Sequence, residues 1–238
     1  MKTVIHKADS RGHADHGWLN AFHSFSFAGY YDPARVHFGA LRVLNDDTVD
    51  GGMGFGFHPH DNMEIITIPL EGQLEHKDSM GNTGTISKGE VQVMSAGTGI
   101  QHSEKNKSAQ DRVKLLQIWV FPDTKNVKPR YDQRAFDLAG SKNKLVPVVS
   151  PVGQTEGLNI HQNAWFHLGK LDKDVTTTYE LKDKQKNGVY AFVIDGDVTI
   201  NGQKLNRRDG LGISETDKLD IQSDSDAELL LMEVPMDV

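Results

Sequence analysis

The sequence of 238 residues contains no cysteine. This absence excludes disulfide bonds, iron–sulfur clusters, zinc ribbons and thiol nucleophiles, because each of them needs a cysteine sulfur. A metal site in this chain must therefore use histidine, aspartate or glutamate side chains. Histidine is unevenly distributed: nine of the 11 histidines lie within residues 1–102, and only His161 and His167 follow.

The chain also lacks a basic excess and long hydrophobic runs. Its 26 Lys and Arg residues against 33 Asp and Glu residues give a net charge of −7, which argues against direct binding to nucleic acid or anionic membranes. No stretch of about 18 apolar residues could span a bilayer, and no signal peptide is visible. We expect a cytoplasmic protein that contacts neither membrane nor nucleic acid, and we predict a monomer.

Short strand-like segments separated by glycine turns dominate what is present. Residues 64–68 and 115–121 are β-branched or aromatic runs of strand length, and no long segment has the 3.6-residue period of an amphipathic helix. Strand-and-turn patterns around Gly72 recur around Gly196, which favours one barrel unit used twice. The expected joint is the segment 123–145, rich in Pro, Lys and Asp.

Two motifs place metal-binding side chains on common strand faces. His58 and His60 have the i, i+2 spacing that directs two side chains to one side of a strand, and His102 and Glu104 repeat this spacing. Three imidazoles and a carboxylate suit Fe, Mn, Ni, Cu or Zn. Glu64 lies six residues after His58, an even offset, so the residues alone leave Glu64 and Glu104 as comparable carboxylate candidates.

Four segments of the sequence resemble the pirin family of bicupins, and specifically its bacterial members of the quercetin 2,3-dioxygenase type. Together they cover most of residues 10–121. They are residues 11–19 (RGHADHGWL), residues 23–33 (HSFSFAGYYDP), His58-Pro59-His60 with Glu64, and residues 95–104 (SAGTGIQHSE). The last two are the most specific.

The resemblance implies an all-β chain of two cupin (jelly-roll) barrels with few short helices. Residues 1–135 would form the metal-binding cupin domain, and residues 136–238 a cupin domain without a metal site. The expected cofactor is one divalent transition metal, first Fe(II), with Mn, Ni, Cu, Co or Zn as alternatives. The family pattern assigns its ligands to four positions, His58, His60, His102 and Glu104.

The resemblance also implies a metal-dependent dioxygenase that cleaves flavonols such as quercetin with dioxygen. Glu64 would then lie behind the ligands, and either Glu64 or Glu104 could act as the general base for the flavonol hydroxyl. Two alternatives stay open. One is a pirin-like regulatory module that binds a protein partner according to metal or redox state, without significant turnover. The other is a different cupin reaction, such as sugar isomerisation or another oxygenation.

The C-terminal half lacks the ligand pattern. Aligning the second copy on Gly196 puts the equivalents of the two strand histidines near Lys182 and Lys184, and no second His-x-Glu motif follows. His161 and His167 are six residues apart and have no carboxylate at matching spacing. We therefore predict no metal in this half.

The aromatic segment 18–27 could line a pocket or belong to the core. Phe25 and Phe27 alternate with serines, which favours core positions in a strand that closes the barrel. We expect His23, in the same segment, to be a buried histidine with its hydrogen bonds satisfied.

Overall fold

The computed structural model describes residues 1–237, and these residues form β-strands with a single 3-10 turn, η1 (Ala8–Ser10). The predicted all-β class is confirmed. The strands form two seven-stranded and two four-stranded sheets, and among the described strands only β13 and β14 pair in parallel. No helix within this part of the chain is long and apolar enough to cross a membrane.

The first large sheet has the order β12-β9-β6-β11-β4-β3-β2, and the small sheet facing it has the order β5-β10-β7-β8. The large sheet contains β2 (Gly12–Asp15), β3 (Leu19–His23), β4 (Leu41–Val49), β6 (Glu64–Glu71), β9 (Glu90–Ser95), β11 (Val113–Val120) and β12 (Arg130–Ala135). The small sheet contains β5 (Gly54–His60), β7 (Gln73–Asp78), β8 (Thr83–Ser87) and β10 (Ile100–Asn106).

The second large sheet has the order β1-β20-β17-β22-β15-β13-β14, and its small sheet has the order β16-β21-β18-β19. The large sheet contains β1 (Lys2–His6), β13 (Leu145–Pro151), β14 (Leu158–Ile160), β15 (Trp165–Leu171), β17 (Asn187–Asp195), β20 (Gly210–Ser214) and β22 (Ala227–Pro235). The small sheet contains β16 (Thr176–Glu180), β18 (Val198–Ile200), β19 (Gln203–Leu205) and β21 (Lys218–Ser223).

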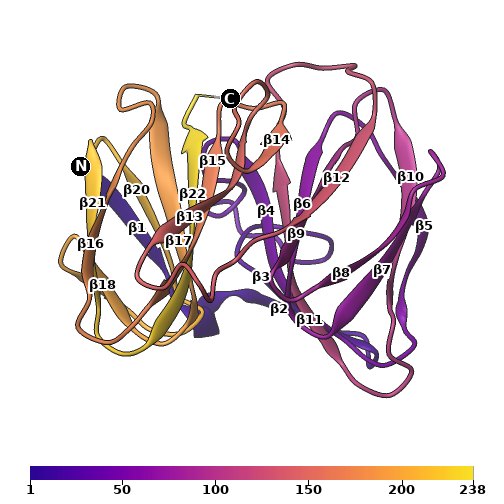
Figure 1. Ribbon diagram of the computed structural model, residues 1–238, viewed down its shortest axis with the longest axis horizontal. Coiled ribbons are helices and arrows are strands. Elements are labelled where there is room, and N and C mark those ends of the chain that lie inside the picture. Colours follow the sequence, from indigo (N-terminus) through magenta and orange to yellow (C-terminus); the bar gives the residue numbers. More distant parts are fainter. Residues whose placement is uncertain (238) are drawn as a thin grey trace.

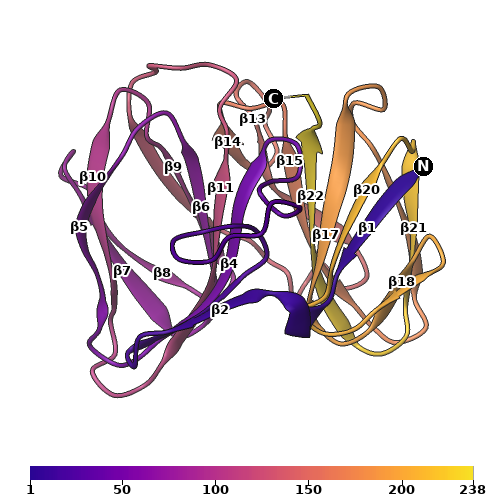
Figure 2. The same cartoon turned by 180° about the vertical axis from the view of Figure 1, so that it is seen from behind.

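The two halves share one topology. The order β9-β6-β11-β4 of the first large sheet recurs as β20-β17-β22-β15 in the second, and β5-β10-β7-β8 recurs as β16-β21-β18-β19. In each half a large and a small sheet pack face to face, as in a jelly roll. Figures 1 and 2 show the small sheets at the two outer sides of the molecule and the large sheets in the middle. The chain is therefore a pair of cupin barrels, as predicted.

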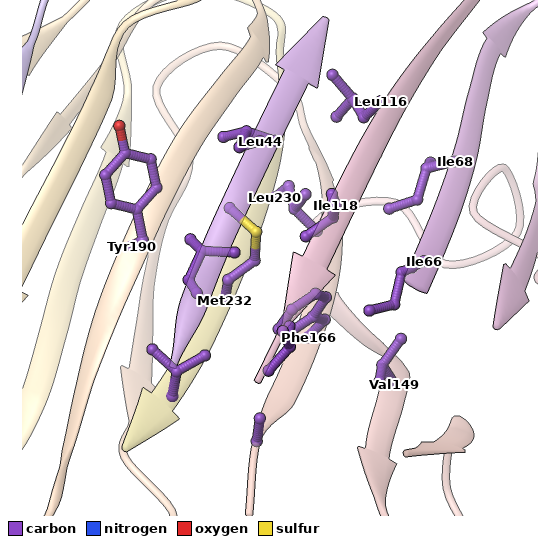
Figure 3. Close-up of a cluster of buried hydrophobic side chains, with 14 of the residues drawn as sticks. Leu44, Ile66, Ile68, Leu116, Ile118, Val149, Phe166, Tyr190, Leu230 and Met232 are labelled. Carbon is purple, nitrogen blue, oxygen red and sulfur yellow. The ribbon is translucent and has the colours of Figure 1, made fainter. Parts of the chain in front are cut away.

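A continuous hydrophobic core joins the two barrels through their large sheets (Figure 3). Side chains from β4, β6 and β11 meet side chains from β13, β15, β17 and β22. The labelled members are Leu44, Ile66, Ile68, Leu116 and Ile118 from the first barrel, and Val149, Phe166, Tyr190, Leu230 and Met232 from the second. Since β6, β17 and β22 are buried on both faces along most of their length, their sequences are mainly apolar runs without strict alternation.

The N-terminal strand lies in the sheet of the C-terminal half. Residues Lys2–His6 pair with β20, in register from Lys2 opposite Ser214 to His6 opposite Gly210. Figure 2 shows the chain passing through η1 from this strand to β2 of the first barrel. The division at 135/136 remains a prediction, with β12 as the last strand of the first large sheet and β13 as the next strand, in the second.

Candidate metal centre

Three histidine side chains from neighbouring strands converge on one side of the small sheet of the first barrel. His58 and His60 lie on β5, and His102 lies opposite His58 on β10. One ring nitrogen of each lies within 4.8 Å of the other two, and the Nε2 atoms of His60 and His102 are 3.1 Å apart. The two His-containing motifs therefore meet, as their strand spacing predicts.

The ring orientations fit a metal ion. The Nδ1 atom of His58 lies 2.8 Å from the carbonyl oxygen of Gly56, which can only accept, so Nδ1 carries the hydrogen and Nε2 presents a lone pair. Two nitrogens at right angles on one ion, each about 2.1 Å from it, are about 3 Å apart. The spacing between His60 and His102 matches this value.

Burial keeps the imidazoles of His60 and His102 neutral. Desolvation lowers the pKa of His60 to about 4, with a smaller contribution from His58. The pKa of His102 falls further below its ordinary value, again mainly through burial and then through its histidine neighbours. Because metal ions bind the neutral imidazole, little free energy is needed to remove protons from these ligands at neutral pH.

Glu104 lies two residues after His102 on β10 and is 2% exposed. Its two oxygens accept hydrogen bonds from Thr67 Oγ1 at 3.2 Å and from Gln117 Nε2 at 2.8 Å. Burial raises the pKa of this carboxyl to about 7, and the two hydrogen bonds partly oppose the rise. Within residues 1–237 the group of mutually close ligand atoms contains the three histidines and does not include Glu104.

The side chain of Glu64 points away from the interior of the first barrel, towards the core between the two barrels. The side chains of Ile66 and Ile68, at the same parity on β6, belong to the core between the barrels, whereas Ile65 faces the barrel interior. The carboxylate of Glu64 accepts a 2.7 Å hydrogen bond from Ser95, and burial raises its pKa to about 7. Glu64, like Glu104, lies outside the group of three mutually close imidazole nitrogens, and its side chain is also on the core face of β6.

A further histidine, His76 on β7, lies directly behind the site. Its ring centroid is 5.4 Å from that of His102, and its Nε2 lies 3.2 Å from Oδ2 of Asp78. From the sequence, His76 is one of five histidines before residue 103 for which we expect only a structural or surface role. The signal was present, since His76 and Asp78 have the same i, i+2 spacing as the two motifs that were recognised.

The histidines open into a cavity of about 790 Å³, within the range of small-molecule sites. Besides the two β5 histidines, it is lined by Pro59, Asp61, Met63, Ser79, Thr98, Gly99, Ile100, Gln101 and Trp119. At its rim Gly97 has a φ of +48°, and a Cβ there would lie 2.0 Å from the carbonyl oxygen of Val127. Only glycine allows the 124–129 segment to approach so closely.

The aromatic segment near the N-terminus divides between core and site. Phe25 is buried in the core between the barrels, as predicted, although it lies after the end of β3 rather than in a strand. Phe27 packs edge-to-face on Trp119 at 5.3 Å and so supports the cavity wall from behind. His23 is a buried, satisfied histidine as expected, since its Nδ1 lies 2.9 Å from Oδ1 of Asn45.

Strand pairing identifies the corresponding positions in the second barrel. His102 lies opposite His58 on β10 and β5, and the equivalent strands β21 and β16 bring Leu219 opposite Tyr179. Two residues further along β21, Ile221 corresponds to Glu104. All three of these residues are buried in the core of the second barrel.

The sequence alignment of the second copy was wrong by three residues. The equivalents of His58 and His60 are Tyr179 and Leu181, not Lys182 and Lys184. The error arises because the loop that follows β16 is longer than the loop that follows β5, so a fixed offset from the later glycine does not hold across it. Both replacements, Tyr179 and Leu181, are buried.

Sequence comparison finds matches along the whole chain. The family model described as Pirin matches residues 4–120, and the model described as Quercetinase C-terminal cupin domain matches residues 147–234. "Quercetin 2,3-dioxygenase" of Escherichia coli (strain K12) is 46% identical over 231 residues, which cover 97% of this chain and 98% of that protein. "Pirin-like protein" of Caulobacter vibrioides is 41% identical over 226 residues, covering 94% and 96%.

Solved structures agree with these matches. YhhW from Escherichia coli superposes with a TM-score of 0.94 at 45% identity, covering 100% of this chain and 99% of that one. The same protein in complex with nickel(II) gives a TM-score of 0.93 at 44% identity, with both chains fully covered. The predicted enzyme class, a quercetin 2,3-dioxygenase-like oxidoreductase, is the class of the named relatives. With a full-length match of this identity and the same pair of barrels, the chain belongs to the pirin family.

Proposed function

We propose that this pirin is a metal-dependent dioxygenase that cleaves flavonols such as quercetin, with the metal held by His58, His60, His102 and Glu104. The observation that carries the proposal is the convergence of three imidazoles, two of which line one cavity. Full-length relatives named quercetin 2,3-dioxygenase support the substrate class. Fe(II) is the metal we propose, with Mn, Ni, Cu, Co or Zn as alternatives; it would supply a Lewis-acid centre where flavonol oxygen and dioxygen meet.

The side chains of the site would have two roles, to bind the ion and to orient its ligands. The three histidines would bind the ion as neutral ligands, and Glu104 would add the single negative charge. Thr67 and Gln117, which donate to the Glu104 oxygens, hold that carboxylate in a fixed orientation. Fixing the ligands before the metal arrives lowers the entropic cost of binding it.

Glu104 is also the better candidate for the base that takes the flavonol hydroxyl proton. It lies two residues after His102, on the strand that carries a proposed ligand. Glu64 faces Ser95 and the core between the barrels, so a proton from the cavity would have to cross β6 to reach it.

Trp119 and its neighbours would hold the flat substrate. The Trp119 ring lies 5.0 Å from the His60 ring in an edge-to-face arrangement and lines the cavity with Met63 and Ile100. Apolar and aromatic walls favour a planar aromatic ligand through burial and stacking. The reaction would insert both atoms of dioxygen, open the central ring and release carbon monoxide. All of these groups come from one chain, so the proposed site needs no second copy. We also propose that the protein acts as a monomer in the cytoplasm.

Quercetin consumption tests the proposal. Purified protein loaded with Fe(II) should consume quercetin and dioxygen and release carbon monoxide, and metal-stripped protein and His60→Ala should do neither. Turnover that survives both changes would overturn the proposed site. Metal binding without quercetin turnover would instead favour the regulatory alternative, in which a protein partner responds to the metal state.

A further inference from the structure

The rings of His76 and His102 are neighbours inside the first barrel, and each has a buried nitrogen without a hydrogen bond. Their centroids are 5.4 Å apart. Within the described part of the chain, neither Nδ1 atom has a hydrogen-bond partner, although both atoms are shielded from solvent. Unpaired buried polar atoms are rare in folded proteins, because such atoms lose water without replacement. Two of them on adjacent rings need an explanation.

The orphaned nitrogen of His102 becomes a donor when the ring binds metal. Its Nε2 is the atom that faces Nε2 of His60 at 3.1 Å, so Nε2 is the atom available to an ion. A neutral imidazole that uses Nε2 as a ligand carries its hydrogen on Nδ1. This N–H then requires an acceptor in the interior of the barrel.

The orphaned nitrogen of His76 is an acceptor. Asp78 accepts hydrogen bonds from the backbone N–H groups of Met80 and Asn82 at 2.9 and 3.0 Å, and from the Asn82 side chain at 2.8 Å. A carboxylate held by this many donors is ionised, so at 3.2 Å it accepts the Nε2–H of His76. The hydrogen of a neutral His76 is then on Nε2, and Nδ1 presents a lone pair.

The surroundings hold this pair in place. The side chains of His76 and Asp78 are both 0% exposed. Tyr131 stacks on the His76 ring, with centroids 4.6 Å apart and planes at 27°. The Asp78 bond and the two neighbouring rings of Tyr131 and His102 thus restrict the orientation of the His76 ring.

A comparison with the second barrel bears on whether His76 is linked to the metal site. His76 is four residues after Gly72, and the residue four after Gly196 in the second barrel is Ile200. Where the histidine equivalent to His102 is replaced by leucine, the polar pair behind it is replaced as well. The barrel that lacks the histidine equivalent to His102 thus also lacks the histidine equivalent to His76.

We propose that Asp78 and His76 position His102 for metal binding, by accepting its Nδ1–H on His76 Nδ1, directly or through one water molecule. His76 is a positioning residue, since it acts through His102 and not on the metal itself. The inference rests on the proposed function, because it takes His102 to be a ligand. It adds two residues for which the sequence analysis had no role.

Nickel(II) titration of metal-free protein tests the proposal. His76→Phe keeps a ring against Tyr131 and His102 but removes the acceptor, and we expect its dissociation constant for Ni(II) to rise about 10- to 100-fold. His76→Asn carries an amide oxygen close to the position of Nδ1 and should lose less affinity than His76→Phe. Tyr131→Phe, the matched control, keeps the stacking and should stay within about twofold of the wild type.

A spectroscopic measurement separates positioning from general stability. In the cobalt(II)-loaded protein, the paramagnetically shifted N–H resonance of His102 should exchange slowly with solvent in the wild type. In His76→Phe this resonance should move and exchange faster. A loss of thermal stability in His76→Phe with the resonance unchanged would overturn the proposal, as would unchanged Ni(II) affinity.

The outcomes also distinguish this inference from the proposed function. Wild-type protein that binds no Ni(II) would overturn both. Wild-type binding with full affinity in His76→Phe would overturn only the role of His76. If His76→Phe does not fold, Asp78→Asn decides, because loss of the carboxylate frees the His76 tautomer: weaker Ni(II) binding supports the proposal, and unchanged binding overturns it.

Discussion

The two barrels of this protein have the same strand order, but the side chains that fill them differ: they include polar groups in the first barrel and are apolar at the equivalent positions in the second. In the first, three histidines converge, and Thr67 and Gln117 donate hydrogen bonds to the buried Glu104 on the strand of His102. In the second, the positions equivalent to Thr67 and Gln117 are Ala191 and Leu231, which belong to a continuous apolar core. A cupin barrel is stable with either filling, so the fold alone does not determine whether there is a metal site.

The mouths of the barrels differ as well. Trp119 of β11 faces Ile65 of β6 and lines the open cavity, and Glu233 of β22 faces Val189 of β17 at the equivalent place. Glu233 is fully buried and accepts hydrogen bonds from its neighbours rather than from a ligand. The donors are the Tyr179 hydroxyl, the backbone N–H groups of Lys182 and Asp183, and the Asn187 side chain.

This difference shows how a duplicated barrel can lose a site and remain stable. The loop after β16 folds over the end of the second barrel, and Glu233 fastens it by its backbone. A buried carboxylate is costly unless its hydrogen bonds are satisfied, and here the loop satisfies them. The same position that receives a substrate in the first barrel, by our proposal, is closed by the chain itself in the second.

The largest expected effect comes from making the first barrel like the second at one ligand. His102→Leu places the residue type found at Leu219 into the metal site. We expect the Ni(II) dissociation constant to rise at least about 1000-fold, more than about 4 kcal/mol, with loss of quercetin turnover. Isothermal titration measures this, with His16→Leu, an exposed histidine, as control. Retained affinity would mean that His102 is not a ligand.

The second test removes the carboxylate of Glu233, which holds the loop after β16 over the end of the second barrel. Glu233→Ala removes the acceptor of several buried donors, and we expect the free energy of unfolding to fall by about 3 to 4 kcal/mol. Denaturant unfolding measures it. Glu228→Ala, on the same strand and in a partly exposed ion pair with Lys170, should cost less than about 1 kcal/mol. Ni(II) affinity should be unchanged in both, and a change would mean that the barrels are coupled.

The third test uses a histidine that holds no metal by our prediction. Burial, with a smaller effect of Lys182, lowers the pKa of His167 to about 4 in the folded protein. As pH falls below 6.5 the unfolded chain takes up this proton first, so the stabilisation is complete above about pH 6.5 and is lost towards pH 4. Between pH 7 and 5.5 the loss from this residue is about 1 kcal/mol. His167→Gln should show a correspondingly smaller drop in unfolding free energy, and an identical drop would refute the assignment.

The smallest expected effect concerns the wall of the open mouth. Trp119→Leu, which removes the aromatic face but keeps an apolar side chain, should raise the KM for quercetin about fivefold, equal to about 1 kcal/mol. Ni(II) affinity should stay within about twofold. Phe57→Leu is the control, since its side chain is 59% exposed. Equal KM values for both variants would remove Trp119 from the substrate site.

Local spacing was sufficient to predict the parts of the site that depend on one strand at a time. The i, i+2 rule put His58 beside His60 and His102 beside Glu104, and the structure brings the two strands together. It failed for Glu64, because β6 is apolar on both faces, and an even offset across the turn between β5 and β6 does not preserve the face. Which face a residue occupies after a turn is set by packing.

Two other features could not be read from local patterns. Which residues of the second barrel correspond to His58 and His60 depends on the length of the loop between β16 and β17. This loop is longer than the loop between β5 and β6, and no residue type in the sequence marks where the additional residues lie. The placement of β1 beside β20 depends on a partner about 200 residues away, which a local hydrophobic pattern cannot identify. The pair His76 and Asp78 was different, since its spacing was readable and only its role was missed.

The position of β1 has a consequence for how the protein is made. On the ribosome, residues Lys2–His6 emerge well before the strand they pair with, Gly210–Ser214. The first barrel can therefore form while this segment still lacks its partner, and the segment must stay free of other strand edges until Gly210–Ser214 have been made. The pairing of β1 with β20 then places a segment that is made before the first barrel in a sheet of the barrel that is made after it.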